Sequence, residues 1–176
     1  MVPASSCDEP PPGAVVRAFD ETSGPGPERA RIDTERWAGL AEAVLCDEGV
    51  PCGELGLRFV DPGVMAELNL AHMGAPGPTD VLAFPIDGGN GGAPAPEPAV
   101  LLGDVVVCPE YAKPRSPGDL AESDDPRPPN DITDELALLV VHGVLHVVGY
   151  DHAHDAEAAA MQAREQQLLA AHHRRP

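Results

Sequence analysis

One of the most apolar stretches of this 176-residue chain, residues 132–148, carries two histidines. The stretch reads "ITDELALLVVHGVLHVV", and its apolar residues follow the periodicity of a helix that is buried on much of its surface. A histidine inside such a helix needs a partner, because burying an unpaired polar group costs free energy. Any fold for this chain must therefore bury this helix and account for His142 and His146.

Strands and helices alternate along the rest of the chain. Alternating and β-rich runs predict strands, while apolar residues at three- and four-residue spacing predict helices. The expected strands are residues 14–20, 54–61, 79–86 and 100–110, and the further expected helices are residues 33–49, 62–73 and 155–172. Asp61 is expected to cap the helix that begins at Pro62. The alternation predicts an α/β or α+β fold in which helices cover one or both faces of a sheet.

Length and composition limit the chain to one core. With 43% hydrophobic residues, a single domain over residues 14–171 is expected. Residues 1–13 are expected to be a disordered N-terminal segment, residues 87–99 and 113–131 flexible loops, and residues 172–176 a tail. Neither a long apolar run nor a signal peptide is visible, so a soluble, cytoplasmic protein is expected. The four cysteines lack a Cys-x-x-Cys pair and are expected to be reduced thiols.

The charge of the chain is strongly negative. Lys and Arg number 11 against 29 Asp and Glu, and the net charge is −18 at pH 7. Proteins that coat nucleic acid carry a basic face, because contacts to phosphates supply much of their affinity. If this chain handles nucleic acid, it must do so through a few local contacts or through a partner. Most of the carboxylates can also be explained without a partner, since net charge keeps a domain soluble.

The histidines of the apolar helix are spaced for metal binding. His142 and His146 are four residues apart, which places both on one helix face about 6 Å apart along the axis. Gly149 permits the positive φ that ends a helix, so the chain can turn back and bring His152 to the first two histidines. Three histidines with an open fourth position are typical of a catalytic zinc site, in which a bound water reaches a pKa of about 7. We therefore predict one zinc ion held by His142, His146 and His152.

The same spacing, H-x-x-x-H-x-x-G-x-x-H, occurs in metzincin proteases. Those enzymes carry a glutamate directly after the first histidine, where it is the general base. This chain has Gly143 there, and general-base help contributes about 10²–10⁴-fold in rate. A metalloprotease is therefore the weaker alternative. Asp151, next to His152, can orient the ligands without touching the metal or be a solvated turn residue.

Three segments resemble the sequence motifs of one known protein family. "HGVLHVVGYDH", residues 142–152, resembles the signature H-G-x-L-H-L-x-G-Y-D-H. "PTDVLAFP", residues 78–85, resembles P-T-D-V-L-S-F-P, with Ala83 in place of serine. "LLGDVVVCPE", residues 101–110, resembles L-L-G-D-I-V-I-C-P-E. These are the motifs of the YbeY family of bacterial endoribonucleases and ribosomal RNA maturation factors, and the resemblance spans roughly residues 14–171, nearly the whole chain.

The resemblance implies a single α/β domain with a small mixed sheet and a zinc or similar metal held by His142, His146 and His152. It implies cleavage of single-stranded RNA in the maturation of the 3′ end of small-subunit ribosomal RNA, and a part in ribosome quality control. The family often carries an arginine, proposed to be catalytic, where this chain has Met73.

Ribosomal RNA and the small ribosomal subunit are therefore the expected partners, and neither DNA nor a membrane is expected. The acidic charge favours a basic ribosomal protein as the docking partner. The alternative from another class of function is a non-catalytic ribosome assembly factor in which the zinc is structural.

Other polar residues near these motifs allow two interpretations. Thr79 and Asp80 follow a proline-rich turn and suit either turn chemistry or a site role. Asp104 is expected to be a structural hydrogen-bonding partner, although the resemblance puts its strand near the cleft. Glu135, seven residues before the first histidine, is expected to be solvated or to cap the helix. The histidines at 172–173 are expected to belong to the tail rather than to the metal site.

Overall fold

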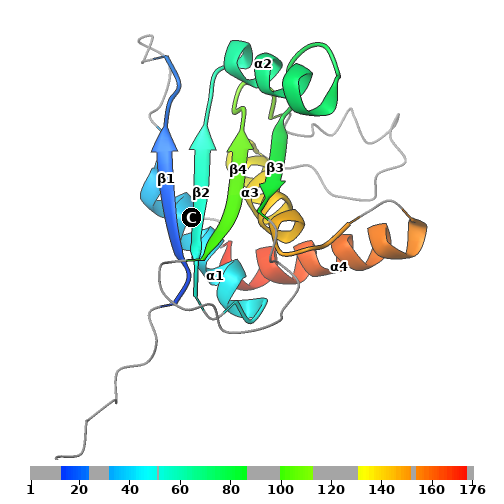
Figure 1. The fold of residues 1–176 in the computed structure, drawn as a ribbon. Coiled ribbons are helices and arrows are strands. Elements are labelled where there is room, and N and C mark those ends of the chain that lie inside the picture. The colour runs from blue at the N-terminus through cyan, green and yellow to red at the C-terminus, as the bar shows by residue number, and fades with distance from the viewer. Residues whose placement is uncertain are drawn as a thin grey trace, which may run out of the picture.

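The computed structural model describes residues 13–23, 32–50, 52–86, 100–112, 131–151 and 154–173. The elements run in the order β1 Val15–Asp20, α1 Thr34–Asp47, β2 Glu54–Phe59, α2 Pro62–Met73, β3 Val81–Pro85, β4 Leu101–Val107, α3 Ile132–Val147 and α4 Asp155–His172 (Figure 1). Every strand and helix expected from the periodicity is present, with small differences at the ends. The predicted alternation of strands and helices is confirmed.

The strands of the described chain form one sheet in the order β1-β2-β4-β3. β1, β2 and β4 are parallel, whereas β3 runs antiparallel to β4, with Val81 opposite Val107. α1 makes the crossover that two consecutive parallel strands require. Parallel neighbours with an antiparallel edge strand make a small mixed sheet, so the expected α/β class is confirmed.

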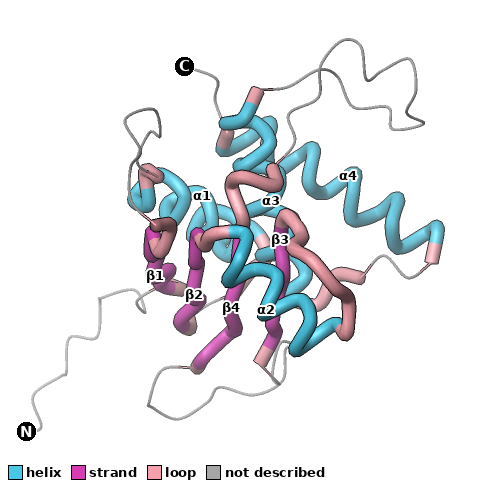
Figure 2. The backbone as a smooth tube through the Cα atoms, turned by 90° about the horizontal axis from the view of Figure 1, so that it is seen from above, coloured by secondary structure: helices cyan, strands magenta, loops and turns pink. Residues whose placement is uncertain are grey.

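Helices cover the two faces of the sheet unequally. In Figure 2, α1, α3 and α4 lie on one side of the sheet and α2 lies on the other. The larger core fills the space between the sheet and the three helices. Ten of the 16 residues of α3 are buried, so the prediction of a buried helix is confirmed. The smaller core, on the α2 side, consists of Val60, Met65, Leu82, Val106 and Cys108.

Two helices that begin after an aspartate are bonded differently at their first turn. Asp131 begins α3 with a capping box, and its carboxylate accepts from the amides of Thr133 and Asp134. Asp61 stands at the expected position before α2, but its carboxylate accepts from the amide and the hydroxyl of Ser23 and makes no cap bond. Asp61 therefore occupies the expected N-cap position, with Pro62 first in the helix, but its carboxylate is bonded to the segment after β1 instead of to the amides of α2.

The segments expected to be disordered or flexible fall almost wholly outside the described residues, at 1–12, 87–99 and 113–130. Asp131 is the N-cap of α3 rather than the end of a loop. α4 continues through His172, one residue beyond the expected domain boundary, and the described chain ends at residue 173. No helix within the described ranges is both long and apolar enough to cross a membrane.

Candidate metal centre

α3 brings the two predicted helix ligands together. The Nε2 atoms of His142 and His146 lie 3.1 Å apart, and their ring centroids lie 4.6 Å apart. The four-residue spacing places both rings on one helix face. The apolar residues of the other faces hold α3 in the core, so the backbone that carries both rings has little freedom to move.

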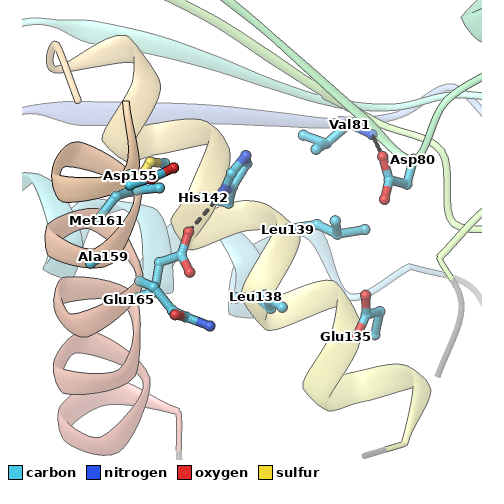
Figure 3. Close-up of a pocket in the computed structure, with 12 residues that line it drawn as sticks. Asp80, Val81, Glu135, Leu138, Leu139, His142, Asp155, Ala159, Met161 and Glu165 are labelled. Atoms are coloured by element: carbon cyan, nitrogen blue, oxygen red, sulfur yellow. Dashed lines mark hydrogen bonds and ion pairs between the residues drawn. The ribbon is translucent and has the colours of Figure 1, made fainter. Parts of the chain in front are cut away.

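Each ring is also held at its Nδ1 atom. His142 Nδ1 lies 2.7 Å from Glu165 Oε1 on α4, and His146 Nδ1 lies 3.0 Å from the backbone carbonyl oxygen of Tyr150. Carbonyl and carboxylate oxygens accept, so each Nδ1 is the donor and carries the hydrogen. In a neutral ring, Nε2 then presents a lone pair. Figure 3 shows the Glu165 carboxylate reaching the His142 ring from α4.

This arrangement fits a metal ion. Two nitrogen lone pairs that face one another at 3.1 Å repel unless a cation or a proton lies between them. Two nitrogens bound to one tetrahedral zinc at about 2.0–2.1 Å would lie about 3.3 Å apart. Metal-binding histidines usually donate their other ring N–H to a carboxylate or a carbonyl, as both rings do here. The imidazole nitrogens, the separation of the two Nε2 atoms and the oxygens that accept from Nδ1 therefore suit zinc.

The third expected ligand, His152, lies outside the described residues. Asp151, which precedes it, is exposed and lines the same cavity as the two helix histidines. Gly149 has a φ of 103°, the turn that the prediction requires after α3. Among the described residues, no group of three His, Cys, Asp or Glu side chains is placed to hold a metal ion. The three-histidine site therefore stays a prediction.

A cavity of about 480 Å³ opens beside the histidine pair. Its walls are the end of α2, strand β3, and the histidine face of α3 with the turn that follows. Met73, which stands where the resemblance implies an arginine, lines this cavity and is 54% exposed. No lysine or arginine is found among the described residues of the cavity wall. A guanidinium that could stabilise developing phosphate charge is therefore missing from the described wall.

A second cavity, of about 610 Å³, also reaches His142 and is acidic. Asp80, Glu135, Asp155 and Glu165 line it. In Figure 3, Asp155 and Glu165 lie on the α4 side near His142, Glu135 lies farther along α3, and Asp80 lies beside Val81. Glu135 is only 7% exposed, so the expectation that it is solvated is wrong, and the N-cap of α3 is Asp131. The reason for the burial of Glu135 is its place on the same helix face as His142, which turns the side chain into the cavity.

Asp80 and Asp104 have different places in the structure. Asp80 Oδ1 accepts from the Val81 amide at 2.8 Å and from the Thr79 hydroxyl at 3.0 Å, so Asp80 combines turn chemistry with a place at the acidic cavity. Asp104 lies on the sheet face away from α3, because the next residue, Val105, packs toward α3 and successive side chains alternate. Asp104 therefore takes no part in the histidine site.

The two histidines expected in the tail lie at the end of α4 and contact carboxylates of other helices. His172 Nε2 lies 2.9 Å from Asp47 Oδ2, and His173 Nε2 lies 2.9 Å from Asp134 Oδ1. These contacts join the end of α4 to the end of α1 and to the start of α3. They are structural links, and the two rings do not approach the pair on α3.

The groups that hold the two rings were not expected from the sequence. Glu165 is 8% exposed and lies on the buried stripe of α4 with Met161 and Leu168. A carboxylate four residues after one buried apolar residue and three before another is the signal that could have identified it. The carbonyl of Tyr150 has no such signal, because every residue carries one and only the turn determines its direction.

Gly143 shows why a protease glutamate does not suit this position. A Cβ atom on Gly143 would lie 2.4 Å from Cγ1 of Val105 on β4. α3 therefore approaches the sheet so closely here that a larger residue would force a shift. A side chain would also point at the sheet rather than at the ring nitrogens of the histidine pair.

These features define a class of protein: a small α/β domain whose buried helix presents two histidines, backed by a carboxylate and a carbonyl, beside a cavity. The sequence model of the family described as "Endoribonuclease YbeY" matches residues 27–173. The chain belongs to the YbeY family, so the resemblance seen in the three motifs is confirmed.

Individual relatives carry the same name. The Endoribonuclease YbeY of Mycolicibacterium smegmatis is 45% identical over 123 residues, which cover 68% of this chain and 64% of that protein. The Endoribonuclease YbeY of Rhodococcus opacus is 44% identical over 143 residues, which cover 78% of this chain and 74% of that protein. A solution structure from Thermotoga maritima aligns at 22% identity with a TM-score of 0.48, and covers 86% of this chain and 87% of that chain. The match thus spans slightly less than two thirds of the mycobacterial relative.

Proposed function

We propose that this protein is a zinc-dependent endoribonuclease that cleaves single-stranded RNA, in maturation of the 3′ end of small-subunit ribosomal RNA and in ribosome quality control. The observation that carries the proposal is the pair of Nε2 atoms, 3.1 Å apart, on rings that are each held at Nδ1. Membership of the YbeY family supports it, since the relatives are named as endoribonucleases. This role would place the protein in the cytoplasm.

One zinc ion per chain would be held by His142, His146 and His152. When bound, it would supply Lewis acidity for attack on a phosphodiester. Glu165 keeps the hydrogen of the first ring on Nδ1, so that Nε2 stays available as a ligand. The Tyr150 carbonyl has the same effect on the second ring. Asp151, in the same cavity wall, would support the ligands without binding the ion.

The cavity beside the histidine pair suits a piece of a single strand. Its volume, about 480 Å³, is within the range of about 300–1,000 Å³ that is usual for small-molecule sites. A nucleotide that has left the stack can enter a space of this size, whereas a duplex cannot. The apolar part of the wall, with Leu82, Ala83 and Pro85 of β3, can cover a base while the histidines face the backbone.

Met73 favours a second candidate function, a ribosome assembly factor in which the zinc is structural. Met73 lines the cavity at the position where the resemblance implies a catalytic arginine. A thioether cannot neutralise the charge that develops on phosphate oxygens during cleavage. Both candidates bind zinc but only the nuclease cuts RNA, so measuring zinc content and RNA cleavage together separates them.

The test measures metal content and RNA cleavage on the same preparations. Protein purified without added metal should contain about one zinc per chain, and His146→Ala and His152→Ala should lose it. The wild type should cut a single-stranded RNA, and the two variants should not. His172→Ala is the matched control, because this exposed histidine is bonded to Asp47 and should be replaceable without loss of metal or activity.

The outcomes distinguish the candidates. Equal zinc in the wild type and His152→Ala would remove His152 from the ligand set. A wild type that holds zinc but cuts neither naked RNA nor RNA in small-subunit particles would favour the assembly factor.

A further inference from the structure

Two consecutive residues of α4, Arg164 and Glu165, are connected to the histidine pair, one through other residues and one directly. Glu165 Oε1 lies 2.7 Å from His142 Nδ1. Arg164 Nε lies 2.6 Å from Oε1 of Glu48, at the end of α1. Successive residues of a helix point about 100° apart, so one turn of α4 reaches two separate partners.

Glu48 connects Arg164 to the turn after α3. Its other oxygen, Oε2, accepts from the Tyr150 hydroxyl at 2.9 Å, and the Tyr150 carbonyl accepts from His146 Nδ1 at 3.0 Å. Both oxygens of the Glu48 carboxylate are therefore used, and its side chain is 11% exposed. Arg164 also donates to the carbonyl of Asp47 at 3.3 Å, which ties it to the same end of α1. A charge-assisted bond between mostly buried groups is shorter and stronger than a neutral one.

We infer that α4 orients both histidine rings, through a direct arm and a relayed arm. In the direct arm, Glu165 holds the first histidine. In the relayed arm, Arg164 holds Glu48, Glu48 holds the Tyr150 hydroxyl, and the Tyr150 carbonyl holds the second histidine. These are positioning residues, since each acts through a ring nitrogen that faces away from the ion. The inference rests on the proposed metal centre, because it states what controls the ligands of that centre.

Tyr150 needs an anchor because it lies beyond the end of α3. It follows Gly149, whose φ of 103° ends the helix, so no helical hydrogen bond fixes the direction of its carbonyl. Its amide donates to the carbonyl of Leu145 at 3.0 Å, which fixes only one side of the residue. The hydroxyl bond to Glu48 fixes the far end of the side chain. With both its amide and its hydroxyl bonded, the Tyr150 backbone has little freedom to rotate, and its carbonyl oxygen stays directed at His146 Nδ1.

Metal affinity is the measurement that reports on both arms. Zn²⁺ is titrated into the full-length metal-free protein against a chelating competitor, and the visible spectrum of the Co²⁺ complex reports the ligand geometry. Loss of a partner that holds a metal-binding histidine weakens affinity by about 10–100-fold. Tyr150→Phe, Arg164→Gln and Glu165→Gln should each raise the Kd for Zn²⁺ by about that range and alter the Co²⁺ spectrum.

The matched control is Glu21→Gln. It breaks another Arg–carboxylate pair, Arg58 to Glu21 at 2.6 Å, on the sheet face away from α3. This variant should leave the Kd for Zn²⁺ unchanged. If Arg164→Gln does not fold, Tyr150→Phe still tests the relayed arm, because it removes a single oxygen atom and keeps the ring.

A double-mutant cycle tests the division into two arms. Tyr150→Phe and Arg164→Gln act on the same arm, so the double variant should bind Zn²⁺ about as weakly as the weaker single variant. Tyr150→Phe and Glu165→Gln act on different arms, so their fold-changes in Kd should multiply.

Each result supports or overturns the inference. If the wild type binds Zn²⁺ and the folded variants bind it equally well, the inference is overturned and the proposed metal centre stands. A lower melting temperature of the metal-free variants with an unchanged Kd also overturns it, since the arms would then only join helices. If the wild type binds no Zn²⁺, the proposed metal centre itself fails, and the inference fails with it.

Discussion

At the scale of the residue, neighbours rather than residue type decide what each carboxylate does. Asp131 and Asp61 both precede a helix, yet the first caps α3 and the second bonds Ser23. Glu165 belongs to a type that is mostly exposed, but it is buried and bonds a histidine ring. The difference lies in which backbone or ring donor comes within reach after folding.

The exposed Glu21–Arg58 pair gives a prediction of pH dependence. The hydrogen bond from Arg58 lowers the pKa of Glu21 below its ordinary value of 4.5. A depressed pKa contributes stability that is complete above 4.5 and is lost as the pH falls through the lower folded value. Because the Glu21 side chain is 41% exposed, solvent screening limits the contribution to about 0.2–1 kcal/mol.

Glu21→Gln should therefore lower the free energy of urea unfolding slightly at pH 7, and the difference from wild type should shrink in acid. Added salt at pH 7 should shrink it too, since the pair is exposed to counterions. An unchanged difference at pH 2 and pH 7 would contradict an ionic contribution.

At the scale of the element, α3 joins the core to the site. One face meets β4 at Gly143, and another presents the two histidines to the cavity. A shift of α3 away from the sheet would move both histidine rings together. Glu165 on α4 and the Tyr150 carbonyl in the turn would not move by the same amount, so the bonds to Nδ1 would change. Close packing against β4 is therefore a condition for the geometry of the site.

Gly143→Ala should destabilise the protein even though alanine favours helices. The added methyl group would lie 2.4 Å from Val105 Cγ1, and such overpacking costs about 1–3 kcal/mol. The gain in helix propensity is about 1 kcal/mol, so a net loss in the free energy of unfolding is expected in denaturant titrations.

Val105→Ala provides the control, because it removes the methyl groups that the new side chain would meet. Gly143→Ala should cost less in that background than in the wild type. A Gly143→Ala protein as stable as the wild type would show that α3 can move at no cost.

At the scale of the whole molecule, the net charge of −18 determines how the protein would bind the proposed RNA substrate. With 11 Lys and Arg against 29 Asp and Glu, few phosphates can be neutralised directly. An acidic surface suits a basic protein partner, so the proposed targeting relies on a basic ribosomal protein of the small subunit.

Naked single-stranded RNA should therefore bind weakly and with a shallow dependence on salt. Each phosphate contact adds about −0.7 to the slope of log K against log salt for a single strand. Binding is measured across a salt series, with naked RNA and small-subunit particles side by side, and the particles should bind more tightly. Tight binding of naked RNA with a slope of about −5 or steeper would contradict this prediction.

The sequence by itself determined the elements, the spacing of the first two histidines and the turn at Gly149. These are local properties: periodicity is set within a few turns or residues, and an i, i+4 pair shares a helix face in any fold. Only the tertiary structure decided the order β1-β2-β4-β3, the contact of Gly143 with β4, and the groups that hold the rings. Glu165 is 23 residues from His142, and Glu48 is 102 residues from Tyr150. No local pattern can specify such pairs, because they meet only where separate helices pack around one core.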